Sequence, residues 1–366
     1  MDVLIKRLTH IVSNESFFNL KTGVVYLGVD PTAPGIHIGH LIPMQLAKEL
    51  QEIGFKIILL VGGFTGKIGD PTGKTKTREN LNESAAENNS LAIVQDYKNW
   101  FKDNITIVNN KDWLNIPLSE YMHLIAHSSI NKQIKMETFH NRLSNNLHLS
   151  GPEFMYPNLQ FIDFLHLHNT YGCNIQIGGQ DQWGNISYGV DMLKKLTEEE
   201  VYGVCTPLLT NKGEKISKSQ NAVFVKDAFN FYQFCLSLSD ELINEICELL
   251  IKRSGNVNDL CKYILDTYFY DGKFQEILNY QDKLNNCTID NCTEDMKIER
   301  SSMKLSKLIA SFEWMSISEA KQKIKENAVY VDNELSEDII INKSCKIQFG
   351  KKNIQFVNIV PEINNE

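Results

Sequence analysis

Apolar residues in the first part of the chain follow two alternating patterns. Residues 23–30 and 55–61 form short apolar runs that predict buried strands. Between them, leucines recur at helical spacing over residues 39–53, which predicts an amphipathic helix. Residues 175–178 predict a third strand. Strands that alternate with helices are typical of an α/β domain built on a parallel sheet, and ligands in such sheets bind at the carboxyl ends of the strands.

The middle of the chain has a purely helical pattern. Apolar residues at helical spacing predict helices over residues 231–238, 241–251 and 258–269. A polar stretch at residues 285–295 follows them and is typical of a linker. We therefore expect a helical domain between the α/β domain and the end of the chain.

The last segment mixes helix and strand. A predicted helix over residues 303–309 is followed by a second helix, which Ser316 and Glu319 open as a capping box. Strands are predicted over residues 328–331 and 345–349. The pattern divides the chain into three predicted domains: an α/β domain over 1–222, a helical domain over 223–292 and a small α+β module over 293–366.

Composition restricts the class of protein. The eight cysteines are scattered and form no Cys-x-x-Cys motif, so we interpret them as reduced thiols. The chain lacks an apolar run of the ~20 residues that a membrane span needs, and its N-terminus lacks a signal-peptide pattern. We therefore expect a cytoplasmic protein. The net charge of −8 argues against bulk nucleic-acid binding, so any RNA contact must use local basic patches.

Two short motifs about 175 residues apart carry the candidate chemistry. The sequence His37-Ile-Gly-His40 lies at a predicted helix start, where backbone N–H groups attract phosphate and two imidazoles share a face. The segment 212–219, Lys-Gly-Glu-Lys-Ile-Ser-Lys-Ser, supplies lysines and hydroxyls. Alone, the first motif fits a capped helix with incidental histidines, and the second fits a basic surface loop. Together they predict a cage that stabilises charge on a triphosphate.

A glycine-rich basic segment at residues 62–78 invites comparison with a P-loop. A P-loop requires glycine six residues before its lysine, and Ile68 occupies that position relative to Lys74. The spacing therefore favours a different phosphate-binding loop, in which Lys74 and Arg78 contact the phosphates.

Polar residues also follow the third predicted strand and the helix before it. Tyr156, Gln160 and Asp163 form one polar stripe at helical spacing. Asp181 and Gln182 follow a Gly-Gly turn at a strand end. The stripe fits a polar binding cavity or, alternatively, a hydrogen-bonded network within the core.

In combination, these motifs resemble those of the bacterial-type tyrosyl-tRNA synthetases, which are class I aminoacyl-tRNA synthetases. Tryptophanyl enzymes share the fold and both nucleotide signatures, but Tyr26, Asp163 and the run after Gly178 favour tyrosine. Six motifs carry the resemblance: Tyr26-x-Gly-x-Asp-Pro-Thr-Ala, His37-x-Gly-His, Gly66-x-Ile-Gly-Asp-Pro, Tyr156-x-x-x-Gln-x-x-Asp, Gly178-Gly-x-Asp-Gln-Trp-Gly-Asn and Lys215-Ile-Ser-Lys-Ser.

The resemblance implies roles for the matched residues, with Tyr26 and Asp163 at the substrate phenol. Six residues would bind tyrosine: Tyr26, Asp70, Tyr156, Gln160, Asp163 and Gln182. Six would line the ATP site: Gly28, Asp30, Gly39, Gly179, Asp181 and Lys218. Eight would act on the phosphates during catalysis: Thr32, His37, His40, Lys74, Arg78, Lys215, Lys218 and Ser219. Five lysines of the last module would contact RNA: Lys304, Lys307, Lys321, Lys323 and Lys325.

The resemblance also implies the fold, the reaction and the partners. The fold would be a Rossmann-like catalytic domain, a helical anticodon-facing domain and an RNA-binding module of the ribosomal-protein type. ATP and L-tyrosine would give tyrosyl-adenylate and pyrophosphate, and tRNA(Tyr) would then accept the tyrosine. Mg²⁺ would accompany ATP, no resident metal would be needed, and the chain would form a homodimer. Three alternatives stay open: a P-loop ATPase or kinase, a catalytically inactive RNA-binding relative, and lysines that only face solvent.

Overall fold

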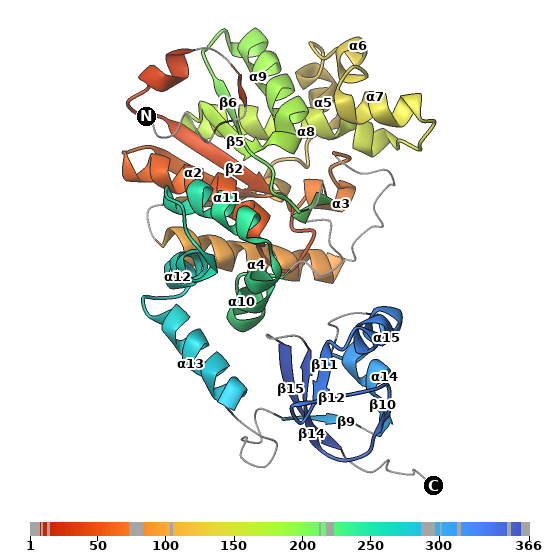
Figure 1. Cartoon of the computed structure of the whole chain (residues 1–366). Helices are drawn as coiled ribbons and strands as arrows, with labels where there is room; N and C mark the ends of the chain where they lie inside the picture. The colour runs from red at the N-terminus through yellow and green to blue at the C-terminus, as the bar shows by residue number, and fades with distance from the viewer. Residues whose placement is uncertain are drawn as a thin grey trace. The chain divides into compact units, whose positions relative to one another are not determined.

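The structure is a computed structural model, and contacts divide the chain into two compact units (Figure 1). The first contains residues 1–231 and 238–271, and the second contains residues 232–237 and 272–366. The structure describes residue 8 and residues 10–12, 15–72, 83–102, 105–211, 214–216, 223–286, 297–300, 302–312, 316–349 and 353–359.

The first unit is built on a six-stranded sheet with strand order β1-β6-β5-β2-β3-β4. The strands from β6 to β4 are parallel, and β1 pairs with β6 in the antiparallel direction. The predicted parallel α/β sheet is thus confirmed. The strands are β1 His10–Val12, β2 Val24–Val29, β3 Lys56–Val61, β4 Ile105–Asn109, β5 Ile175–Gly179 and β6 Tyr202–Thr206.

Helices cover both faces of this sheet, because its central strands are apolar on both sides. Figure 1 shows α8 and α9 on one side and α2 and α4 on the other. The chain order reverses between β2 and β5, which makes their carboxyl ends the expected ligand site. The four long helices are α2 Ile38–Glu52, α4 Glu83–Phe101, α8 Gly151–Tyr171 and α9 Trp183–Thr197.

Short elements connect these strands and helices. The predicted helix over residues 39–53 corresponds to α2, and Gly54 ends it with a φ of 102°, a value that favours glycine. The short elements are η1 Glu15–Asn19, α3 Thr65–Ile68, η2 Asn110–Asp112, α5 Leu118–Leu124, α6 Ile130–Gln133, α7 Glu137–Ser144, η3 Gln180–Gln182, β7 Thr210–Asn211 and β8 Glu214–Lys215.

The three helices predicted in the middle of the chain are confirmed. Within the first unit, α11 packs against α2 and α12 packs against α4. The boundaries at residues 222 and 292 stay a prediction. The helices of this segment are α10 Ala228–Ser237, α11 Asp240–Ile251, α12 Val257–Tyr268 and α13 Lys273–Asn286.

The last module has its own core and a five-stranded sheet of order β12-β11-β14-β15-β9. The capping box of Ser316 and Glu319 is confirmed. The helix predicted over residues 303–309 begins only at Leu305, because the two preceding residues pair with β13 as a short strand. The elements are β9 Lys297–Arg300, β10 Met303–Lys304, α14 Leu305–Ala310, α15 Ile317–Lys325, β11 Val329–Val331, β12 Glu334–Leu335, β13 Ile340–Ile341, β14 Cys345–Phe349 and β15 Asn353–Ile359.

Two features bear on the expectations from composition. In the ranges that the structure describes, no helix is both long and apolar enough to cross a bilayer. The cysteines within the described part of the chain lie buried as free thiols: Cys173, Cys205, Cys235, Cys247, Cys261 and Cys345.

Candidate active site

The candidate site residues gather at the carboxyl ends of the parallel strands. Asp30 follows β2, Thr65 and Asp70 follow β3, and Asp181 follows β5. Helix α8 adds Tyr156, Gln160 and Asp163 along one stripe. This arrangement agrees with the switch in strand order, the position where ligands bind in sheets of this kind.

The two histidines of the first signature build the start of α2. The Nδ1 atom of His37 accepts a hydrogen bond from the Gly39 N–H at 3.1 Å. In return, the Nδ1 atom of His40 accepts one from the His37 N–H at 3.2 Å. Their rings stack with centroids 3.9 Å apart. Because both Nδ1 atoms accept, each neutral ring carries its proton on Nε2, the atom that can donate to a phosphate.

The chain that follows the second signature returns to the first. Phe224 forms an isolated β-bridge with His37, and the Val225 N–H donates to the Ile36 carbonyl at 3.0 Å. Lys215 lies in β8, which pairs with β7. The remaining predicted phosphate-binding residues lie outside the described residues: Lys74, Arg78, Lys218 and Ser219.

The phenol end of the predicted site centres on two buried side chains. The Tyr26 hydroxyl is buried and has no hydrogen-bond partner among the described residues. The Asp163 carboxylate accepts from Trp113 Nε1 at 2.9 Å and from Asn110 Nδ2 at 3.0 Å. Burial raises the pKa of the Asp163 carboxyl to about 7, although these two hydrogen bonds lower it. Gln176 pairs with Tyr26 across the sheet, and its buried Oε1 likewise has no partner within the described chain.

A chain of hydrogen bonds runs from Asp163 to the end of β2. Asn110 donates to both Asp163 and Thr65, and the Thr65 hydroxyl donates to Asp30 Oδ1 at 2.7 Å. The Tyr156 hydroxyl donates to Asp30 Oδ2 at 2.8 Å. The alternative of a hydrogen-bonded network within the core therefore accounts for Tyr156 and Asp163. It does not account for the Tyr26 hydroxyl. The sequence patterns did not single out Asn110, Thr65, Trp113 or Gln176.

The remaining predicted side chains lie around this network. Gln182 donates to Asp70, which also accepts from the Thr72 N–H at 2.9 Å. Gln160, Thr32 and Asp181 are half-buried. Burial raises the pKa of Tyr156 and the charges of Asp30 and Asp70 add to that shift, so Asp70 and its partner Gln182 lie near the network.

Glycine lets the backbone be approached at two of the predicted positions. Gly28 is exposed although β2 lies inside the sheet, and a Cβ atom there would make only an ordinary contact with Leu60, 3.5 Å from its Cδ2 atom. At Gly179, a Cβ atom would lie 2.8 Å from Asp181 Oδ1, so a side chain would displace that carboxylate. At Gly39, by contrast, the His37 ring fills the space, with its Cε1 atom 3.0 Å from the position of a Cβ atom.

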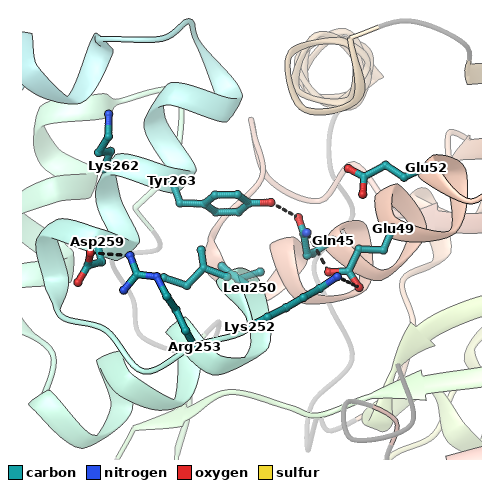
Figure 2. A pocket seen from close by; sticks show the side chains of 10 residues that line it. Gln45, Glu49, Glu52, Leu250, Lys252, Arg253, Asp259, Lys262 and Tyr263 are labelled. Carbon is teal, nitrogen blue, oxygen red and sulfur yellow. Dashed lines mark hydrogen bonds and ion pairs between the residues drawn. The ribbon is translucent and has the colours of Figure 1, made fainter. Parts of the chain in front are cut away.

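A second hollow lies at the other end of α2 and does not belong to this site. It has a volume of about 430 Å³ and lies between α2, α11 and α12 (Figure 2). Most of its charged groups form ion pairs, including Lys252 with Glu49 at 3.2 Å and Arg253 with Asp259 at 2.8 Å. These paired charges fit a structural contact between helices.

Comparison with known proteins agrees with this geometry. The family profile of class I tRNA synthetases (W and Y) matches residues 20–329. A tyrosine–tRNA ligase of Clostridium botulinum is 31% identical over 98% of this chain and 97% of its own length. The chain belongs to the class I tyrosyl-tRNA synthetase family. Membership of this family is inconsistent with the alternative of a P-loop ATPase or kinase. The position of Ile68 already disfavoured a P-loop.

Other relatives match over a shorter span. The tyrosine–tRNA ligases of Anaplasma phagocytophilum and Wolbachia pipientis are each 36% identical, and the chain spans 61% and 60% of their lengths. A C-terminally truncated mitochondrial tyrosyl-tRNA synthetase of Aspergillus nidulans superposes with a TM-score of 0.65. It is 24% identical and covers 77% of this chain and 93% of its own. At this identity the likeness supports the fold of the synthetase family.

Proposed function

We propose that this chain ligates L-tyrosine to tRNA(Tyr) in two steps that consume ATP. The observation that carries the proposal is the buried Tyr26 hydroxyl, which has no partner among the described residues and lies in the same site as Asp163. A buried hydroxyl without a partner is costly, and a ligand hydroxyl would remove that cost. A substrate phenol between Tyr26 and Asp163 fits this requirement.

The other residues of the site fit the rest of the substrate. Asp70, Tyr156 and Gln160 would hold the α-ammonium group, and Gln182 would lie near the carboxylate. That carboxylate attacks the α-phosphorus of ATP, so no protein nucleophile is required. The protein instead holds the two reactants in place and stabilises the charge that develops on the phosphates.

The nucleotide would occupy the exposed side of β2 and the start of α2. The exposed backbone at Gly28, the Asp30 and Asp181 carboxylates, and Gly179 would line the nucleoside end. Thr32, His37 and His40 would contact the phosphates at the helix start, and Mg²⁺ would enter bound to ATP. Lys74, Arg78, Lys215, Lys218 and Ser219 complete the proposed ATP site, and Gly39 would lie beside it under the His37 ring.

The proposal is tested by exchange of labelled pyrophosphate into ATP. We expect exchange that requires tyrosine and is far slower with tryptophan or phenylalanine at the same concentration. Exchange without tyrosine, or none at all, would refute the proposed activation step. A catalytically inactive RNA-binding relative would show no exchange but would still bind tRNA.

Replacing Tyr26 with Phe separates stability from substrate use. Because the Tyr26 hydroxyl has no partner among the described residues, its removal should leave the Tm unchanged or raise it. The same change removes a hydrogen bond to the substrate phenol, so kcat/KM for tyrosine should fall by roughly fivefold, about 1 kcal/mol. The ratio of kcat/KM for tyrosine to that for phenylalanine should narrow. An unchanged ratio would exclude Tyr26 as a phenol ligand.

The pH dependence of tyrosine use should report the ionisation of Asp163. A carboxylate accepts a phenol hydrogen bond better than a carboxylic acid, so kcat/KM for tyrosine should fall as the pH drops below about 7. The Trp113 indole lowers the Asp163 pKa, and Trp113→Phe should therefore move the midpoint to higher pH. Trp100→Phe, which removes an indole that does not contact Asp163, should leave the midpoint in place. A midpoint unmoved by Trp113→Phe would exclude this assignment.

We also propose the three-domain organisation at residues 1–222, 223–292 and 293–366, a cytoplasmic location and a homodimer.

The homodimer is supported by exposed apolar side chains on α5 and α6, among them Leu118, Met122 and Ile130. Sedimentation of the chain and of a Met122→Asp variant would test it. A single-chain mass for the unaltered protein would contradict the proposal.

RNA binding by the last module is the remaining part of the proposal. Lys304, Lys307, Lys321 and Lys325 are exposed on or next to α14 and α15, as phosphate contacts require. Lys323 forms an ion pair with Glu326 at 2.7 Å, so it is a weaker candidate than the other four.

A further inference from the structure

A buried carboxylate holds the segment that precedes the first signature. Asp96 lies on α4, 60 residues after Ile36 in the sequence. Its Oδ2 atom accepts a hydrogen bond from the Ile36 N–H at 2.7 Å. Its side chain is only 2% exposed. Burial raises the pKa of this carboxyl, while its hydrogen bonds and the charge of Lys226 oppose that shift. A buried carboxylate kept by specific donors fixes those donors in place.

The other oxygen of Asp96 reaches the helical segment of the same unit. Its Oδ1 atom accepts a hydrogen bond from the hydroxyl of Tyr268, the last residue of α12. Tyr268 is itself buried, so the contact is shielded from water. Asp96 therefore connects α12 to the backbone of Ile36 through one side chain.

Ile36 is also the residue that the chain after the second signature contacts. Its carbonyl accepts from the Val225 N–H at 3.0 Å, so both backbone groups of Ile36 are held from outside α2. The next residue is His37, whose N–H donates to His40 Nδ1. A shift of Ile36 would therefore move the His37 N–H that orients the His40 ring, and the His40 ring is stacked on that of His37.

We propose that Asp96 is a positioning residue for His37 and His40, and that Tyr268 links α12 to this position. The inference rests on the proposed function, because it assigns Asp96 an effect on adenylate formation. Asp96 would touch no substrate. It would set the angle at which the imidazoles meet the phosphates, an effect that appears in the transition state more than in tyrosine binding.

A purely structural role is the competing explanation, and α12 offers a matched control. The hydroxyl of Tyr263 also bonds a buried group of the α/β unit, Gln45 Oε1 at 2.9 Å (Figure 2). Gln45 lies at the middle of α2, more than one turn beyond His40, and donates to Glu49 one turn further from the histidines. Tyr263→Phe and Tyr268→Phe thus remove the same atom from the same helix, and only the second touches the Asp96–Ile36 contact.

The experiment measures tyrosine-dependent pyrophosphate exchange, tyrosine KM and Tm for the full chain and three variants. Asp96→Asn offers one acceptor oxygen in place of two, so one of its two donors meets an amide NH₂. We expect kcat to fall about tenfold or more, with tyrosine KM within about twofold of the unaltered value. Tyr268→Phe should lower kcat by about threefold, while Tyr263→Phe should change kcat by less than about 1.5-fold. The fall in Tm should be similar for these two variants.

Two results would overturn the inference. One is a kcat for Tyr268→Phe equal to that of Tyr263→Phe. This result would contradict the inference even if Asp96→Asn does not fold. The other is a rise in tyrosine KM as large as the fall in kcat, which would indicate general disturbance of the site. If the unaltered chain shows no tyrosine-dependent exchange, the proposed function fails and the inference fails with it. If the unaltered chain is active, these outcomes test Asp96 alone.

Discussion

Replacing His40 with Ala should slow tyrosyl-adenylate formation by about 2–4 kcal/mol of barrier, the usual loss for one preorganised donor to a transition state. This corresponds to roughly 30- to 900-fold in the single-turnover rate. Tyrosine affinity should change little, because the proposed tyrosine-binding side chains come from β2, α8 and the segments that follow β3 and β5. The measurement is the rate of adenylate formation at saturating tyrosine and ATP, beside the dissociation constant of tyrosine.

The structure requires a control for helix capping in that experiment. His40 Nδ1 accepts the His37 N–H, so Ala also removes half of a capping box, which costs roughly 0.5–2 kcal/mol of stability. Gln at the same position can accept that bond, as in ordinary capping boxes, but lacks the imidazole. His40→Gln should therefore keep the Tm and still lose the rate. A rate restored by Gln would mean that His40 acts through the helix start alone.

Local signals in the sequence were sufficient for the start of α2. The pair of histidines, the helical spacing of leucines and Gly54 all lie within 18 residues, and the structure has the helix where they predict it. The sequence Asp332-Asn333 is likewise typical of a tight turn, and both residues adopt positive φ between β11 and β12. Capping and turn geometry are decided by neighbours in sequence, so a pattern can predict them.

Contacts distant in sequence could not be predicted in the same way. Asn110 and Trp113 bond Asp163 from 53 and 50 residues away, and they follow β4, an edge strand that is only half-buried. An edge strand of this kind lacks the apolar run that marked the central strands. Asp96 is a comparable case, because its role depends on Ile36 and Tyr268, which only the folded chain brings to it.

The helix predicted over residues 303–309 shows a related error. Leu305, Leu308 and Ile309 do form the buried face of α14. The pattern extended this face back to Met303, whose apolar side chain fits either a helix or a strand. Pairing of Met303 with Ile341 decides the outcome, and that partner is 38 residues distant. Tertiary pairing thus overrides a short helical pattern at its margin.

Removal of the last module should separate tyrosine activation from tRNA charging. A chain truncated after Cys292 retains the residues proposed for the tyrosine and ATP sites, all of which precede Gln220. We expect its pyrophosphate exchange to stay within about twofold of the full chain, and its kcat/KM for tRNA to fall by about 100-fold. The reason is the loss of exposed lysines on and beside α14 and α15 that can contact RNA phosphates.

Salt dependence decides whether those lysines act on RNA or only face solvent. Each lost phosphate contact should flatten the slope of log affinity against log salt by ~0.7–0.9. The full chain with Lys304, Lys307, Lys321 and Lys325 changed to Ala should show this loss with the module still folded, while Lys323→Ala should have a smaller effect because Lys323 is paired with Glu326. Equal tRNA affinity and equal slope at two salt concentrations, for the full chain and both variants, would mean that these lysines only solvate the surface of the module.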